Sequence, residues 1–365
     1  MSANHVVSVN LGGVRGLEGE VRFSNGLNII LGPNNSGKTS ILEALMISYI
    51  MNFENVGVGL QKIMVQQAAR GSMKHALADI VGDKQAKPCI TLNDKRRVCV
   101  SLSKEYKLVP GVSGLGEAVT LVFRSDSSCN VKIDISKTGI KVDIKGKCNE
   151  KPQSLGYLPT GILPYNFFDT LIGYIKRTDP GKLEDIVLEL GNDKYIVDLG
   201  IDPWQEAVVI MRKYGNGKPL TFYSIGRGVQ RAFIIMTLLN LFDISLIDEV
   251  ESAMHPELLR YLGSYIAKRL KGDKQIIITS QSLEASTILA SSILDPSDPT
   301  ANRSILLERA REKCIEKHET YDNIFSIIII TRKDNKIKSL VKKGCDAIIY
   351  LAGTRDPRLS YRLME

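Results

Sequence analysis

The residues best suited to chemistry are Gly32 to Thr39, which read GPNNSGKT. They fit the spacing G-x-x-x-x-G-K-[ST], in which glycines let backbone N–H groups wrap a polyphosphate and the lysine reaches the β- and γ-phosphates. The apolar run LNIIL precedes the motif and ILEALMISYI follows it. A strand should therefore enter the loop, and the N-terminus of a helix should face the phosphates. The motif predicts binding of a nucleoside triphosphate with Mg²⁺.

Each position of this loop has an expected part in nucleotide binding. Gly32 and Gly37 permit the backbone path, Lys38 neutralises phosphate charge, and Thr39 ligates Mg²⁺. A chance Gly-Lys-Thr turn is the alternative, which the flanking strand and helix disfavour. The expected nucleotide-binding residues of the loop are Gly32, Asn34, Asn35, Ser36, Gly37, Lys38, Thr39 and Ser40.

Two carboxylates follow a second apolar run. Residues 242–251, FDISLIDEVE, predict a strand that ends in Asp248 and Glu249. A strand running parallel beside the one that enters the phosphate loop would bring Asp248 to the Mg²⁺. It would leave Glu249 to polarise a water in line with the γ-phosphate, as the catalytic base of hydrolysis. Acidic residues often end strands, so this pair alone is weak evidence for a catalytic site. The phosphate loop that precedes it in the sequence makes the evidence strong.

A serine and two spaced glycines precede this strand, in YSIGRGVQRAFIIMTLLNL. Ser224, Gly226 and Gly228 stand where an apolar helix should begin, which predicts a second helix start suited to an anion. One chain holds one triphosphate, already bound by Lys38. We therefore expect the second start to meet the γ-phosphate on a partner subunit, so that two chains enclose two nucleotides about a twofold axis. A glycine turn before a core helix is the simpler alternative.

The elements that must position these residues can be read along the chain. Residues 5–31 predict three short strands, and Arg15, in the glycine-rich turn after the first, is a candidate for phosphate or base contact. A surface turn residue is the alternative for Arg15. A helix is expected over 39–51, with further helices over 55–86 and 166–190.

The middle of the chain changes to an alternating pattern. EAVTLVFR, CNVKIDIS and GIKVDIKG predict an antiparallel sheet with a hairpin turn at 136–139. Its lysine-rich outer face is interleaved with aspartates, which favours a solvated face over a polyanion site. Residues 147–165, rich in Gly and Pro, predict a loop that returns to the core. Residues 193–214 predict a pair of strands.

The last part of the chain predicts a strand hairpin that turns at 333–335, followed by a helix or loop. The four isoleucines at 327–330 suit a buried strand. The basic residues of this tail could bind phosphate backbones, and a solvated basic rim is at least as good an interpretation. They are Lys336, Lys338, Lys342, Lys343, Arg355 and Arg358.

Composition sets the class of protein. The chain has 365 residues, is 44% hydrophobic and carries a net charge of +8, which permits attraction to nucleic acid without demanding it. It shows no targeting segment and no apolar run long enough to span a bilayer, so we expect a cytoplasmic protein without a membrane partner. The six cysteines form no C-x-x-C pair, which predicts reduced thiols.

Four motifs, in their order and separations, resemble the ATP-binding-cassette-type (ABC-type) ATPases of the RecF/SMC class. The likeness is closer to the AAA-family ATPases related to the OLD (overcoming lysogenisation defect) proteins. It covers the N-terminal 50 residues and about 220–365. The motifs are GPNNSGKT, SIGRGVQR, LIDEVESAMHP and IIITSQSLE.

The resemblance assigns roles to several residues. Asp248 and Glu249 match the Walker B pair, and Arg15 matches an arginine that reaches the nucleotide. At the position of Gln281 many relatives have His. Gln can hydrogen-bond a γ-phosphate or water but cannot exchange a proton, so hydrolysis is expected to be slow. The signature motif, which acts on the partner's nucleotide, is matched by Ser224, Gly226, Gly228 and Arg231.

The expected fold is α/β: a P-loop NTPase head of the ABC type, with a mixed central sheet flanked by helices. Residues 1–51 and 220–365 should form the ATPase core, and 52–219 an inserted helical and antiparallel lobe. We expect no counterpart within this sequence to the metal-dependent Toprim nuclease domain of the OLD proteins, because the segment after Gln281 is short and lacks a recognisable Glu…Asp-x-Asp cluster.

The expected function is hydrolysis of ATP by a homodimer acting on DNA in repair, chromosome handling or defence. One alternative is a nucleotide-gated switch that hydrolyses slowly or not at all and recruits an effector protein encoded elsewhere. A transporter ATPase subunit is the other, less favoured because SIGRGVQR departs from the transporter form LSGGQ.

Overall fold

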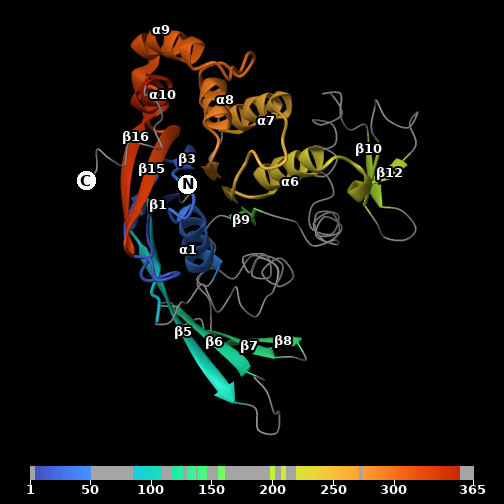
Figure 1. The fold of residues 1–365 in the computed structure, drawn as a ribbon, viewed down its shortest axis with the longest axis vertical. Helices are drawn as coiled ribbons and strands as arrows, with labels where there is room; N and C mark the ends of the chain where they lie inside the picture. Colours follow the sequence, from blue (N-terminus) through green and yellow to red (C-terminus); the bar gives the residue numbers. More distant parts are fainter. Residues whose placement is uncertain are drawn as a thin grey trace.

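The computed structural model describes residues 5–50, 85–108, 117–125, 130–136, 139–145, 155–160, 198–201, 207–210, 219–270 and 274–353. The helices expected over 55–86 and 166–190 lie almost wholly outside these ranges. The described residues form a mixed α/β fold with three sheets (Figure 1). None of the helices in this part of the chain is both long and apolar enough to cross a membrane.

The central sheet has six strands in the order β16-β15-β3-β14-β13-β9. All pairs are parallel except β15 with β16, which forms the antiparallel edge. Parallel strands covered on both faces read as continuous apolar runs, and the isoleucines at 327–330 are accordingly buried. The strands are β3 (Leu27–Leu31), β9 (Leu155–Leu158), β13 (Ile244–Ile247), β14 (Gln275–Ser280), β15 (Phe325–Lys333) and β16 (Lys336–Lys343).

The second sheet is antiparallel and has seven strands in the order β2-β1-β4-β5-β6-β7-β8. The predicted hairpin is confirmed, with Ser136 opposite Gly139. A third sheet joins β10 (Asp198–Ile201), β11 (Ala207–Ile210) and β12 (Pro219–Thr221), which confirms the strand pair expected in 193–214. The seven strands are β1 (Val6–Asn10), β2 (Glu20–Arg22), β4 (Cys89–Leu92), β5 (Arg97–Leu108), β6 (Glu117–Ser125), β7 (Asn130–Ser136) and β8 (Gly139–Lys145).

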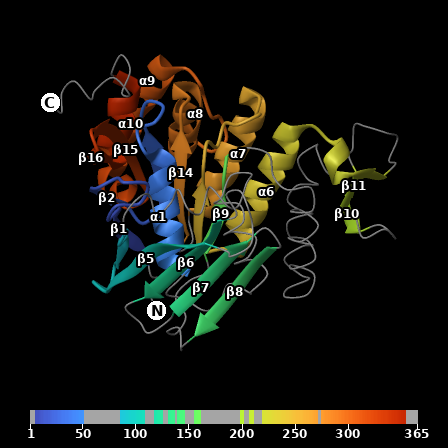
Figure 2. The ribbon, with the colours of Figure 1, turned by 60° about the horizontal axis from the view of Figure 1, so that its bottom comes forward.

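Helix α1 (Lys38–Ile50) contacts strands of both large sheets, and all its side chains from Ile41 to Tyr49 are buried. A helix that is buried on every side needs such a position between two layers. The other helices pack on strands of the central sheet, from β9 to β16, and on one another (Figure 2). They are η2 (Phe222–Ser224), α6 (Arg227–Leu241), α7 (Pro256–Arg269), α8 (Leu283–Leu294), α9 (Arg303–Asp322) and α10 (Gly344–Gly353).

Two expectations about the central sheet are wrong. Residues 147–165 were expected to form a loop, but β9 lies within them and pairs with β13 along its whole length. This four-residue strand has all side chains buried, so it shows no alternation that would reveal it in the sequence. The second error concerns β13, which runs parallel to β3 but not beside it, because β14 lies between them.

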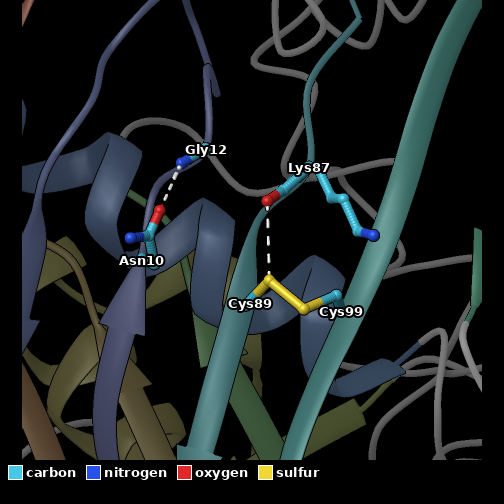
Figure 3. Close-up of a disulfide and its surroundings, with 5 residues drawn as sticks. All are labelled: Asn10, Gly12, Lys87, Cys89 and Cys99. Carbon is cyan, nitrogen blue, oxygen red and sulfur yellow. Dashed lines mark hydrogen bonds between the residues drawn. A yellow bond between two sulfur atoms is a disulfide. The ribbon is translucent and has the colours of Figure 1, made fainter.

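The prediction of reduced thiols is also wrong for the described cysteines. Cys89 and Cys99 stand opposite each other on β4 and β5 and form a disulfide (Figure 3). A second disulfide joins Cys314 of α9 to Cys345 of α10. Residues that far apart in the sequence meet only through the tertiary fold. Disulfides occur in oxidising compartments and also inside hyperthermophile cells, so these cysteines do not identify the compartment.

Candidate nucleotide-binding site

The phosphate loop joins the end of β3 to the start of α1, as the motif predicts. It turns through left-handed backbone at Asn35, with φ 61°, and at Gly37, with φ 97°. A Cβ at Gly37 would lie 2.6 Å from Cδ1 of Ile337 and 3.1 Å from Cδ1 of Leu17, so only glycine fits. The loop is thus supported from behind by the β15–β16 hairpin and by the turn that follows β1.

Lys38 and Ser36 give the loop its fit to a phosphate. Lys38 is 6% exposed, and its Nζ donates to the carbonyls of Gly32 and Pro33, both at 2.9 Å. The ammonium is therefore fixed across the mouth of the loop. The buried hydroxyl of Ser36 has no hydrogen-bond partner within the described structure. A phosphate oxygen would satisfy this group, so the residues present fit a polyphosphate.

Thr39 and Asp248, the residues expected to bind the metal ion, contact each other. Oγ1 of Thr39 donates to Oδ2 of Asp248 at 2.9 Å, and Oγ1 of Thr279 donates to Oδ1 at 2.6 Å. Asp248 is 1% exposed, so its orientation is set by these two hydroxyls. A hydroxyl and a carboxylate beside a polyphosphate are the oxygen ligands that Mg²⁺ prefers. Thr39 and Asp248 are thus the residues that would hold Mg²⁺.

The backbone N–H and both carboxylate oxygens of Glu249 make hydrogen bonds. Its backbone lies in the left-handed region, with φ 51°, and its N–H donates to Oγ1 of Thr279 at 2.8 Å. One carboxylate oxygen accepts from Oγ1 of Thr160 at 2.5 Å, and the other accepts from Nε2 of Gln281. Non-glycine residues held in this region cluster at functional sites. The arrangement fixes a carboxylate at the edge of the pocket.

Thr160 was missed by the sequence analysis, because the strand that precedes it was expected to be a loop. It follows β9, which ends beside β13, so the carboxyl ends of the two strands bring Thr160 and Glu249 together. The only sequence signal is the short apolar run at 155–158 followed by Pro-Thr.

We expect Thr160→Val to lower kcat for ATP hydrolysis by roughly tenfold, because a hydrogen bond to a charged group of this kind is worth about 1.5 to 3 kcal/mol. The substitution keeps the shape of the side chain and frees one oxygen of Glu249. Steady-state kinetics would measure the change. Thr237→Val is the matched control, because its hydroxyl donates to Phe233 within α6. Equal kcat values for the two variants would contradict the assignment.

Gln281 lies at the end of β14 and contacts two acidic residues. Its backbone N–H donates to Oε1 of Glu251 at 2.6 Å, while its side chain donates to Glu249. Glu251 also accepts from the N–H of Ser282, the N-cap residue of α8, at 3.0 Å. The amide at the expected switch position thus contacts the expected catalytic carboxylate.

Arg15 lies at the pocket but is paired within its own subunit. Its Nε and Nη2 donate to the two carboxylate oxygens of Glu43, at 2.6 and 2.8 Å. Glu43 lies on α1 and is 0% exposed, so the pair fixes the guanidinium against the helix that leaves the phosphate loop. The expected contact of Arg15 with phosphate or base stays a prediction.

The four residues matched to the signature motif separate into two groups. Ser224 and Gly226 are exposed, and Gly226 precedes α6 without any side-chain cap. A Cβ at Gly228 would lie 2.4 Å from the carbonyl oxygen of Ala253, so α6 packs closely on the turn after Asp248 and Glu249. The exposed pair does not line the pocket of its own chain.

Arg231 points into its own subunit. Arg231 is 6% exposed, and its guanidinium donates to the carbonyls of Pro159, at 3.2 Å, of Asp248, and of Glu249, at 3.2 Å. Burial lowers the pKa of Arg231, and the nearby carboxylates of Asp248 and Glu249 oppose this shift. In this position Arg231 joins α6 to the carboxyl ends of β9 and β13.

These groups surround one pocket of about 560 Å³. Asp248 and Gly32 stand directly behind it through their bonds to Thr39 and Lys38. Leu17 and Arg332 also line it, although neither was expected at the site. The expected site residues that line the pocket are Arg15, Asn34, Asn35, Ser36, Gly37, Lys38, Thr39, Ser40, Glu249 and Gln281.

Comparison with known proteins gives similarities at the level of domains and folds. None of the curated proteins compared with the chain matches it. Among solved structures, the "SMC head domain from Thermotoga maritima" is 12% identical, with 92% of this chain and 98% of that chain covered and a TM-score of 0.37. The "SmcHead bound to the C-winged helix domain of ScpA" is also 12% identical, with coverage of 93% and 98% and a TM-score of 0.46. The "recombination mediator protein RecF-ATPrS in RecFOR pathway" is 11% identical, with coverage of 93% and 99% and a TM-score of 0.38.

Two domain families match the sequence itself. Residues 8–145 match a family described as "AAA domain". Residues 156–286 match a family described as "AAA domain, putative AbiEii toxin, Type IV TA system". The first segment holds the phosphate loop, and the second holds Asp248, Glu249 and Gln281. These groups, assembled around one pocket, therefore lie in two segments of the chain that each match an AAA-domain family.

Proposed function

We propose that this protein binds and hydrolyses ATP as the head of a nucleotide-dependent homodimer. The observation that carries the proposal is the meeting of Thr39, Asp248 and Glu249 at the mouth of the phosphate loop. These groups come from two distant segments of the chain and have the chemistry that hydrolysis of a phosphoanhydride requires. The matches to AAA domains support the same activity.

Different residues of the chain have different roles in the reaction. Lys38 and the loop N–H groups bind the β- and γ-phosphates, and Thr39 and Asp248 hold the metal ion. Mg²⁺, when bound, neutralises charge that develops on the transferred phosphoryl group. Glu249 accepts a hydrogen bond from the attacking water and orients it. Thr160 and Gln281 hold the carboxylate of Glu249 so that it keeps this direction.

Homodimerisation is supported by the exposed start of α6. Ser224 and Gly226 lie outside the pocket of their own chain, and the first N–H groups of α6 lack a side-chain cap. Uncapped N–H groups at a helix start favour an anion. The γ-phosphate bound by a second subunit would provide one. ADP lacks that phosphate, so the dimer should form with ATP and separate after hydrolysis.

We propose a cytoplasmic protein related to the OLD-type ATPases, in which the nucleotide cycle acts on DNA or on an effector protein encoded elsewhere. The net charge of +8 supports a polyanionic partner. The division into a core at 1–51 and 220–365 with an insert at 52–219 belongs to the same proposal, with β9 as the strand that the insert contributes to the central sheet. A slow nucleotide switch is the second candidate, because the amide of Gln281 stands where an exchangeable proton would speed turnover.

The test is the rate of ATP hydrolysis and the mass by size-exclusion chromatography, each measured with and without DNA. Hydrolysis, together with a doubled mass in ATP but not in ADP, is the expected result. A doubled mass without turnover would favour the switch. A chain that binds no ATP would exclude both functions.

A further inference from the structure

A basic side chain from the C-terminal hairpin faces the nucleotide pocket, and the phosphate motifs do not account for it. Arg332 lies near the end of β15 and lines the pocket beside the phosphate loop. It is exposed, and its Nε donates to the carbonyl of Asp334 at 2.7 Å. Nη2 donates to Oδ1 of Asn335 at 3.4 Å. The guanidinium is thus oriented by its own turn.

The hairpin that carries Arg332 is fixed to the pocket wall. The N–H of Glu18 donates to the carbonyl of Asn335 at 2.7 Å, and the N–H of Ile337 donates to the carbonyl of Glu18 at 2.8 Å. Ile337 and Leu17 pack behind Gly37. The hairpin, the turn after β1 and the phosphate loop therefore form one continuous surface.

The register of β15 places Arg332 alongside the loop. Ile329 pairs with Leu31, the last residue of β3. A Cβ at Gly32 would lie 3.0 Å from Cγ1 of Ile330, so this side chain stands next to the first residue of the loop. Arg332 is two residues farther along β15, so its side chain lies on the same face of the strand as that of Ile330.

The order of strands decides which end of the nucleotide Arg332 can meet. Glu249 and Gln281 follow β13 and β14, on one side of β3, and mark the γ-phosphate end. Arg332 is on β15, on the other side of β3. Three strand spacings, roughly 14 Å, separate β13 from β15. A nucleotide whose γ-phosphate lies near Glu249 therefore has its nucleoside toward β15.

We propose that Arg332 binds the nucleoside part of the nucleotide, as a specificity residue of the site. This rests on the proposed function. The other pocket cations have different partners: Lys38 holds the loop carbonyls, and Arg15 is paired with the buried carboxylate of Glu43. The planar guanidinium can stack on a base and donate to sugar oxygens at the same time, which a lysine ammonium cannot.

The test compares the binding of ADP and of inorganic triphosphate by calorimetry, each with Mg²⁺. We expect Arg332→Ala to weaken ADP binding about tenfold and triphosphate binding less than about twofold, because only ADP carries a nucleoside. Arg22→Ala is the matched control, because Arg22 is 74% exposed on β2 and does not line the pocket. It should bind both ligands as the wild type does.

The outcomes separate this inference from the proposed function. A wild type that binds neither ADP nor triphosphate would contradict the proposed function itself. A wild type that binds ADP, with Arg332→Ala equal to Arg22→Ala, would overturn the role of Arg332 alone. Equal weakening of both ligands would make Arg332 a phosphate contact and overturn its placement. If Arg332→Ala does not fold, Arg332→Lys provides the test. We expect this variant to bind ADP more weakly than the wild type and to bind triphosphate equally well.

Discussion

Glu249→Gln should lower the rate of ATP hydrolysis by about 10²- to 10⁴-fold, the usual contribution of a positioned general base. The amide has nearly the same shape as the carboxylate, so the backbone bond to Thr279 and the contact with Thr160 can persist. The amide carries no negative charge, so it is a weaker hydrogen-bond acceptor for the attacking water than the carboxylate is. Single-turnover hydrolysis measures the chemical step directly.

Binding of ATP should survive the same substitution, because Lys38, Thr39 and Asp248 are unchanged. The variant should therefore accumulate as an ATP-bound dimer in size-exclusion chromatography. Glu257→Gln is the matched control, since Glu257 is exposed in the first turn of α7 and lies outside the pocket. Turnover by Glu249→Gln at the rate of this control would exclude Glu249 as the base.

The parts of the site that could be predicted are those encoded by local sequence. The phosphate loop needs a strand, two glycines and a helix start in one short segment, and the structure has all three. Asp248 and Glu249 end a buried strand, and parallel strands gather such ends at one edge of a sheet. A strand between β13 and β3 does not change this, since the carboxyl ends still meet at Thr39.

The parts that could not be predicted depend on pairings between distant segments. Thr160 reaches Glu249 only because β9 joins β13, and four buried residues carry too little pattern to show a strand. Arg332 was not among the basic residues considered in the tail, because nothing in its local sequence indicates that its side chain lines the pocket. The disulfide between Cys89 and Cys99 follows from the register of β4 and β5. Arg231 shows that a motif position does not fix the direction of a side chain.

An equimolar mixture of two inactive variants should recover about a quarter of the wild-type ATPase activity, if each active site is shared between subunits. Lys38→Ala removes the phosphate cation of a subunit's own site. Ser224→Arg obstructs the exposed start of α6, which should act on the partner's nucleotide. In a mixed dimer, one site receives both defects and the other receives none. Half of randomly assorted dimers are mixed, and each has one intact site of two.

The control mixture is Lys38→Ala with Glu249→Gln. Both residues line the pocket of their own chain, so every site in this mixed dimer keeps one defect and the mixture should stay inactive. Recovery in the first mixture and none in the second therefore separates groups that act within a subunit from groups that act across the interface. Ser224→Arg alone should still bind ATP, because Ser224 lies outside its own pocket. A first mixture as inactive as the second would show that α6 does not complete the partner's site.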